Sequence, residues 1–138
     1  MAAHPDRLDP ATVESFVADA HGDLHAVSEA LSREPALVNA AWDWGDGDWE
    51  TALGAAAHMG RREIAELLLE HGARIDIFAA AMLGHVQLVR ALTTAVPASL
   101  EAKGPHGIPL LAHARAGGAE AQAVVDLLES ARAPAALR

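Results

Sequence analysis

The three tryptophans of this chain lie close together and alternate with carboxylates. The indoles are those of Trp42, Trp44 and Trp49. The acidic residues among and after them are Asp43, Asp46, Asp48 and Glu50. An indole face attracts cations, a neighbouring carboxylate adds charge to that attraction, and tryptophan is enriched in interface hot spots. The segment is therefore predicted to bind a cationic or amphipathic partner, while an alternative remains open in which some of the rings fold back to anchor a long loop.

Histidine supplies the second candidate chemistry. Imidazole titrates near neutral pH, so an imidazole beside a carboxylate can act as an acid–base pair. We interpret His58 and His106 as the histidines that could face a notch between residues 39–51 and 97–108. His21 and His25 flank a turn that should direct their rings along different helices, and no third ligand is fixed nearby. We interpret these two as exposed and predict no metal site.

Motifs for covalent catalysis, dinucleotide binding and calcium binding are incomplete in this sequence. The chain has no cysteine, and its serines stand singly outside any Gly-x-Ser-x-Gly motif. The run Gly45-Asp46-Gly47 lacks the third glycine and the preceding strand of a dinucleotide fingerprint. The acidic run that starts at Asp46 has Thr51 and Ala57 where a calcium loop needs glycine and glutamate. We therefore predict no catalytic residue, no cofactor and no metal ion.

The elements that must position these residues are predicted to be helices. Apolar residues make up 51% of the chain but aromatic residues only 4%, so alanine, leucine and valine dominate, as is typical of closely packed helices. One stretch, residues 51–73, resembles an ankyrin repeat, with Ala52 and Gly54 replacing the usual proline and histidine. The matching positions are Thr51, Leu53, Ala56, Ala57, Gly60, Glu63, Ile64, Leu68, Leu69, Gly72 and Ala73.

This resemblance implies an all-α fold, an ankyrin-repeat α-solenoid of helix-turn-helix pairs with a concave binding surface. The glycine between the two helices of each unit sets the register, and these glycines are Gly22, Gly60, Gly84 and Gly117. We predict a single domain over residues 1–138 with units at about 12–38, 49–73, 75–94 and 107–130, and a frayed tail at 131–138. The first unit is read as a degenerate cap, and the fourth as carrying a local insertion before a capping helix.

The spacing of the units predicts missing β-hairpin fingers. Only 24 residues separate Gly60 from Gly84, which is too few for the hairpin that normally joins ankyrin units. The connections at 39–51 and 97–108 are long by contrast. We expect a notch between these two long connections.

The resemblance also implies which residues contact a partner, namely those at the hairpin tips and the two that precede each inter-helix glycine. In the central units these are His58, Met59, Met82 and Leu83, and Arg115 is contributed by the last unit. An alternative in which Met82 and Leu83 pack beneath a loop stays open. The full set of predicted binding residues is Trp42, Asp43, Trp44, Asp46, Asp48, Trp49, His58, Met59, Met82, Leu83, His106 and Arg115.

The charge of the chain limits its partners. Ten lysines and arginines stand against nineteen acids, giving a formal charge of −9. Nucleic acid and anionic membranes are therefore not expected as partners. The first residues lack an apolar signal segment, and the longest uncharged stretch, 77–89, is too short to span a membrane, so we expect a cytoplasmic protein.

These observations together predict a non-catalytic module, expected to be a monomer, that binds a basic or amphipathic protein or peptide. The alternative is a pocket between 39–51 and 97–108 that binds or transforms a small molecule.

Overall fold

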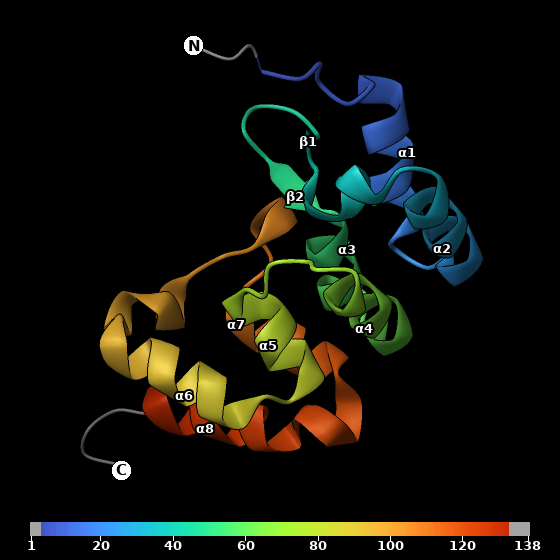
Figure 1. Cartoon of the computed structure of the whole chain (residues 1–138). Helices are drawn as coiled ribbons and strands as arrows, with labels where there is room; N and C mark the ends of the chain where they lie inside the picture. Colours follow the sequence, from blue (N-terminus) through green and yellow to red (C-terminus); the bar gives the residue numbers. More distant parts are fainter. Residues whose placement is uncertain (1–3, 133–138) are drawn as a thin grey trace.

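The computed structural model describes residues 4–132, and the all-α prediction is confirmed (Figure 1). The α-helices are α1 Pro10–Asp19, α2 Leu24–Arg33, α3 Ala52–His58, α4 Arg62–Glu70, α5 Ile77–Leu83, α6 Val86–Ala95, α7 Leu110–Ala116 and α8 Gln122–Arg132. Short 3-10 helices are η1 Pro35–Asn39, η2 Pro97–Glu101, η3 Pro105–Gly107 and η4 Gly118–Ala121. Strands β1 Ala41–Asp43 and β2 Trp49–Thr51 form one antiparallel hairpin. No helix within residues 4–132 combines the length and apolar character needed to cross a membrane.

The helices form four antiparallel pairs, and the first helices of successive pairs stack against one another in the order α1, α3, α5 and α7. Side-chain caps begin three of these helices: Asp9, Thr51 and Asp76 each accept a hydrogen bond from the backbone N–H three residues later. The inner faces of α3 and α5 are built from buried alanines, whose small side chains let neighbouring helices approach closely. The buried apolar side chains form two clusters along the stack, and α5 contributes residues to both.

Two of the turns between paired helices require glycine. Gly60 and Gly84 have φ angles of 67° and 82°, in the left-handed region. A Cβ atom on Gly84 would also lie 2.2 Å from the carbonyl oxygen of Glu120 in the next unit. These glycines therefore allow both the turn and the close contact between successive units.

The connections between pairs differ in structure. The β1–β2 hairpin lies between α2 and α3, with Ala41 opposite Thr51 in register. Between α4 and α5 the chain forms no strand, and the Asn39 side chain holds this crossing by donating to the Gly72 carbonyl and accepting from the Arg74 N–H. The connection 97–108 consists of η2, η3 and an isolated bridge from Lys103 to Pro109 rather than a hairpin.

Two predicted surface residues belong to the core. Met82 is fully buried and Leu83 is only 6% exposed. The prediction that they line an open surface is wrong because α5 is packed between α3, α6 and α7, which leaves no free face at its carboxyl end. The insertion expected in the fourth unit corresponds to η4. Ala131 and Arg132 complete α8, and the rest of the predicted frayed tail lies outside the described residues.

Candidate functional site

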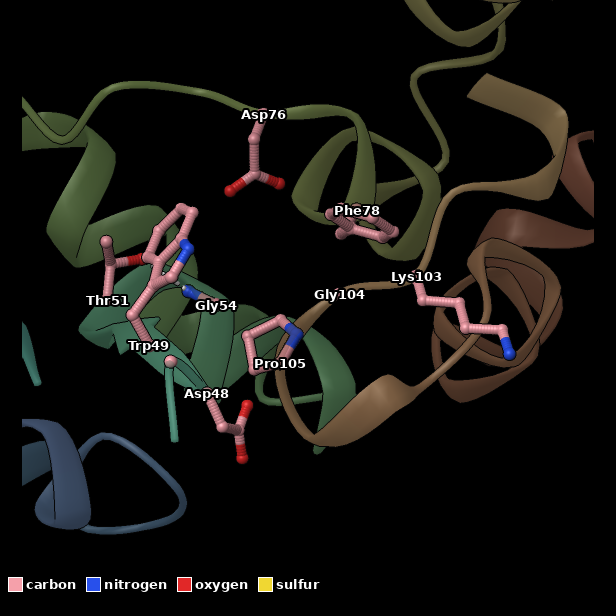
Figure 2. A pocket seen from close by; sticks show the side chains of 10 residues that line it. Asp48, Trp49, Thr51, Gly54, Asp76, Phe78, Lys103, Gly104 and Pro105 are labelled. Atoms are coloured by element: carbon pink, nitrogen blue, oxygen red, sulfur yellow. Dashed lines mark hydrogen bonds between the residues drawn. The ribbon is translucent and has the colours of Figure 1, made fainter. Parts of the chain in front are cut away.

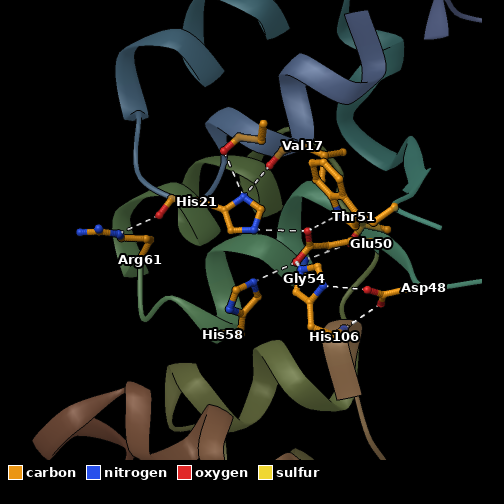
Figure 3. Close-up of polar contacts among 11 residues, drawn as sticks. Val17, His21, Asp48, Glu50, Thr51, Gly54, His58, Arg61 and His106 are labelled. Carbon is orange, nitrogen blue, oxygen red and sulfur yellow. Dashed lines mark hydrogen bonds and ion pairs between the residues drawn. The ribbon is translucent and has the colours of Figure 1, made fainter. Parts of the chain in front are cut away.

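Three imidazoles converge on one buried carboxylate between the β1–β2 hairpin, the first helical pair and η3 (Figure 3). The Nε2 atom of His21 lies 3.3 Å from Glu50 Oε1. The Nε2 atoms of His58 and His106 lie 3.0 and 3.3 Å from Glu50 Oε2. We call this group the His/Glu cluster; its members are His21, Glu50, His58 and His106.

Strand β2 brings Glu50 into the cluster by the alternation of side chains along a strand. Trp49 and Thr51 line a cavity at the surface, whereas the Glu50 side chain is fully buried. Thr51 caps α3 directly after the strand, so the backbone that carries Glu50 is fixed against that helix. His58 is the last residue of the same helix and reaches the same carboxylate.

His21 enters the cluster from the corner between α1 and α2. Its Nδ1 atom lies 3.0 Å from the carbonyl oxygens of both Val17 and Ala18. A carbonyl oxygen only accepts, so Nδ1 carries the hydrogen and Nε2 is the atom turned toward Glu50. The prediction that His21 is a solvent-exposed corner residue is wrong, because these carbonyls rotate the ring inward and leave its side chain 27% exposed.

His106 reaches the cluster from η3 and is held by Asp48 of the hairpin. Asp48 accepts from both the backbone N–H and the Nδ1 of His106, each at 2.7 Å. His106 adopts a φ of 61°, a left-handed conformation that residues other than glycine adopt at a cost of about 1 kcal/mol or more. The two hydrogen bonds to one carboxylate hold this residue in that conformation.

The hydrogen bonds and charges around Glu50 favour its ionised form. Burial by itself raises the pKa of a carboxyl group, but the polar contact from His58, the indole N–H of Trp44 and the charges of His21 and His106 outweigh it, so the pKa of Glu50 is lowered. The Trp44 Nε1 donates to Glu50 Oε1 at 2.8 Å.

The contacts around His106 also shift its own pKa and that of Asp48, which bonds to it from outside the cluster. Partial burial opposes the charged form of His106, but the hydrogen bond to Asp48 and the charges of Glu50 and Asp48 raise its pKa. The backbone N–H of His106, which donates to Asp48, is the largest influence that lowers the pKa of Asp48.

Two polar atoms at the centre of the cluster have no hydrogen-bond partner among residues 4–132. They are Glu50 Oε2 and His58 Nε2, and both are buried. Although the two atoms lie 3.0 Å apart, their geometry is not that of a hydrogen bond. Buried polar atoms nearly always have a hydrogen-bond partner, so the lack of one at both of these atoms requires an explanation.

A cavity of about 250 Å³ lies on the other side of β2, between the hairpin and η3 (Figure 2). Trp49 and Phe78 stand on opposite sides of it, with Pro105 between them. The charged residues of the lining are Asp48, Asp76 and Lys103, and the position corresponds to the notch expected between 39–51 and 97–108. We call this space the notch cavity.

The structure distributes the predicted tryptophans among three environments. Trp42 is half-buried and packs against the core, as the loop-anchor alternative describes. Trp44 is 38% exposed and contacts the His/Glu cluster. Trp49 is 63% exposed at the rim of the notch cavity.

The remaining predicted residues do not all meet. Asp43 accepts from the backbone N–H groups of Gly45 and Gly47 and so organises the hairpin turn, while Asp46 is exposed at its tip. Met59 is 44% exposed, and Arg115 is exposed on α7 with its guanidinium 3.5 Å from Glu129. Neither Met59 nor Arg115 lines the notch cavity or belongs to the His/Glu cluster.

Sequence reasoning missed Glu50 as a centre of chemistry and assigned His21 to solvent. It also did not name Phe78 or Asp76 as lining residues. One signal for Glu50 was available, because an acid placed immediately before a helix-capping threonine in a short strand must point away from the tryptophan that precedes it.

Three comparisons with known proteins place this geometry in context. The family model described as Ankyrin repeat matches residues 48–79, which include β2, α3, α4 and the start of α5. The match therefore covers Glu50 and His58 of the cluster and Trp49 and Phe78 of the notch cavity. No curated protein and no solved structure gave a match to the chain.

Proposed function

Because this chain carries an ankyrin repeat at residues 48–79 within a helical fold consistent with an ankyrin-repeat protein, we propose that it is a protein-binding module. Its binding site is the notch cavity together with the acidic hairpin tip. The preferred partner is a segment that presents an apolar or aromatic side chain next to a basic one.

The observation that carries this proposal is the position of Trp49. A large indole that is 63% exposed is costly to leave in water, and this one stands at the rim of a cavity opposite Phe78. A partner side chain that enters between the two rings would bury both, in the manner of an interface hot spot.

The negative charge of the hairpin favours a partner that carries a basic residue beside its apolar one. No lysine or arginine occurs between Arg33 and Arg61, whereas Asp43, Asp46 and Asp48 lie in that interval. Asp46 is exposed at the hairpin tip and forms no ion pair within the described chain. Complementary charge steers association and fixes orientation, so a basic residue beside the apolar anchor is favoured.

The size of the cavity favours a protein segment over a free small molecule. Its volume of about 250 Å³ is below the roughly 300–1,000 Å³ of typical small-molecule pockets. It accommodates one or two side chains of an extended segment.

The test is selection from a random peptide library, followed by affinity measurement with fluorescently labelled peptides. We expect the selected peptides to combine an aromatic or aliphatic residue with lysine or arginine. Trp49→Ala should weaken their binding at least about tenfold, as loss of a hot spot does. Asp46→Asn, which keeps a residue type that tolerates positive φ, should reduce the salt dependence of binding.

The matched control is Val96→Ala, which removes an exposed apolar side chain at the end of α6, away from the notch cavity. The Val96→Ala variant should bind the selected peptides with the same affinity as the unmodified protein. Peptides that lack basic residues and bind equally well to Trp49→Ala would overturn the proposal, as would a small molecule that occupies the cavity in place of any peptide.

A further inference from the structure

We propose that the His/Glu cluster binds a divalent transition-metal ion such as Zn²⁺, with the three imidazole Nε2 atoms and a Glu50 carboxylate oxygen as its ligands. This inference concerns the buried side of β2 and does not depend on peptide binding in the notch cavity.

The distances within the cluster suit one small ion. Ligands bound tetrahedrally at about 2.0–2.1 Å lie about 3.3–3.4 Å from one another. The Nε2 atoms of His58 and His106 lie 3.0 and 3.3 Å from Glu50 Oε2, and the Nε2 atom of His21 lies 3.3 Å from Oε1 of the same carboxylate. All four candidate ligand atoms lie within 4.8 Å of one another, so a modest inward movement of the imidazoles completes the coordination.

The hydrogen bonds behind the imidazoles direct lone pairs into the centre. His21 gives its Nδ1 hydrogen to backbone carbonyls, and His106 gives its own to Asp48. With a hydrogen fixed on Nδ1 of each ring, Nε2 is the atom that faces Glu50, and a metal ion that binds there takes the place of any proton on it. Metal-bound histidines show the same arrangement, with the outer nitrogen bonded to a carbonyl or a carboxylate.

The unpaired atoms provide an independent indication. Glu50 is fully buried and the side chain of His58 is nine-tenths buried, yet the facing atoms Oε2 and Nε2 have no hydrogen-bond partner in the described part of the chain. Leaving such atoms unsatisfied costs about 1–3 kcal/mol each, more where one is charged. A cation between them would satisfy both atoms at once.

The ligand set selects the kind of ion. Imidazole nitrogen suits Zn²⁺, Co²⁺, Ni²⁺ and Cu²⁺, whereas Mg²⁺ and Ca²⁺ prefer all-oxygen sites. With neutral imidazoles, Glu50 and Asp48 leave two negative charges to balance a divalent ion. His21 and His106 are 27% and 35% exposed, so an ion can reach the site from solvent.

A bound ion would connect parts of the chain that are distant in sequence. The ligands come from the α1–α2 corner, the hairpin, the end of α3 and η3. The ion would thus link the first helical pair and η3 to the second pair. Because it binds only the folded arrangement of these ligands, it would stabilise the folded state.

The test uses the full chain without an affinity tag, freed of metal by a chelator that is then removed. Equilibrium dialysis against Zn²⁺ should give one bound ion per chain, and the melting temperature should rise with Zn²⁺ concentration. Co²⁺ should produce the visible absorption bands of a tetrahedral complex, which Zn²⁺ then displaces. Mg²⁺ should change neither the melting temperature nor the Co²⁺ absorption.

Variants assign the ion to this site. His106→Gln and Glu50→Gln should each weaken Co²⁺ binding by at least tenfold, and Asp48→Asn, which removes the carboxylate that orients His106, should weaken it by about 10–100-fold. Circular dichroism verifies that each variant is folded. His85→Gln, at an exposed histidine outside the cluster, is the matched control and should bind like the unmodified protein.

Two results would overturn the proposal. One is unmodified protein that binds no Zn²⁺ and gives no Co²⁺ spectrum, in which case the cluster is a buried ion-pair network only. The other is equal Co²⁺ affinity in the folded His106→Gln variant and in the unmodified protein, which would place the bound ion on other histidines.

Discussion

Glu50 Oε2 and His58 Nε2 face each other at 3.0 Å in the buried centre of the hairpin connection, and the contact joins strand β2 to the end of helix α3. Only six residues of backbone follow Thr51 before His58, so helix α3 itself sets the separation of the two side chains. Glu50 is the charge that the three imidazoles surround, so a substitution there affects all three contacts.

Replacing Glu50 in the metal-free protein should therefore lower the free energy of unfolding substantially. Glu50→Ala leaves the imidazoles without a counter-charge and Trp44 without its acceptor, and should lower the free energy of unfolding by about 3–5 kcal/mol, as is usual when one partner of a buried pair is removed. Glu50→Gln keeps the side-chain volume and the Trp44 acceptor and should cost less. Urea denaturation measures both, and a loss below about 1 kcal/mol for Glu50→Ala would contradict the assignment of this charge to a paired, buried state.

The buried residues of the repeat at 51–73 lead to a second prediction. Leu68 on α4 is fully buried, so Leu68→Ala should destabilise the protein by about 2–5 kcal/mol through lost burial and an internal cavity. Leu88→Ala on α6, where the side chain is 36% exposed, is the control and should change stability by less than about 0.5 kcal/mol. Similar urea midpoints for the two variants would show that α4 does not pack as described.

Two glycines with positive φ allow backbone strain to be separated from steric contact. Gly84→Ala places a methyl group at φ 82° and 2.2 Å from the Glu120 carbonyl oxygen, whereas Gly72→Ala, at φ 95°, meets nothing within 4 Å. Strain alone costs about 1–2 kcal/mol, so Gly72→Ala should lose about that much and Gly84→Ala clearly more. Equal losses in thermal unfolding would mean that the contact between α5 and η4 is not tight.

Much of the architecture was predictable from the sequence because local chemistry determines it. Thr51 caps α3, Gly84 ends α5, and the short spacing between Gly60 and Gly84 leaves no room for a hairpin between α4 and α5. These signals lie close together in the sequence, so the expectation of stacked helices with no finger between the second and third units could be made without knowing any distant contact.

The His/Glu cluster was not predictable in the same way. His21 lies in the first unit and His106 in the connection 97–108, and they meet only because that connection folds back toward the first helical pair. Sequence spacing contains no information about that path, nor about the Val17 carbonyl that turns His21 inward. Met82 was misassigned for a related reason, because its place before an inter-helix glycine does not show how many neighbours cover the end of α5.

A further buried histidine, His113 on α7, predicts a pH dependence of stability that is separate from the cluster. Its side chain is fully buried against Phe78, with ring centroids 4.7 Å apart, and its Nδ1 donates to the Pro109 carbonyl at 2.9 Å. Burial is the largest influence and lowers the pKa of His113; the nearby His58 acts in the same direction, while the Pro109 hydrogen bond and Asp76 oppose it.

The sign of the effect follows from which state binds the proton. Below about pH 6.5, the ordinary pKa of histidine, the unfolded chain takes up a proton at His113 that the folded protein does not. The stability associated with a neutral His113 is therefore complete above that pH and is lost as the pH falls toward the lowered folded pKa. His113→Gln, which retains a donor for Pro109, should show a smaller loss of unfolding free energy between about pH 7.5 and 5.5 than the unmodified protein.

Chemical denaturation in the presence of a chelator, carried out across this pH range, provides the measurement without interference from metal ions. The control is His85→Gln, whose exposed side chain makes no capping hydrogen bond at the start of α6 and whose pH profile should overlay that of the unmodified protein. If His113→Gln loses as much stability on acidification as the unmodified protein does, the folded state accepts a proton at His113 and the ring is not sealed beneath Phe78.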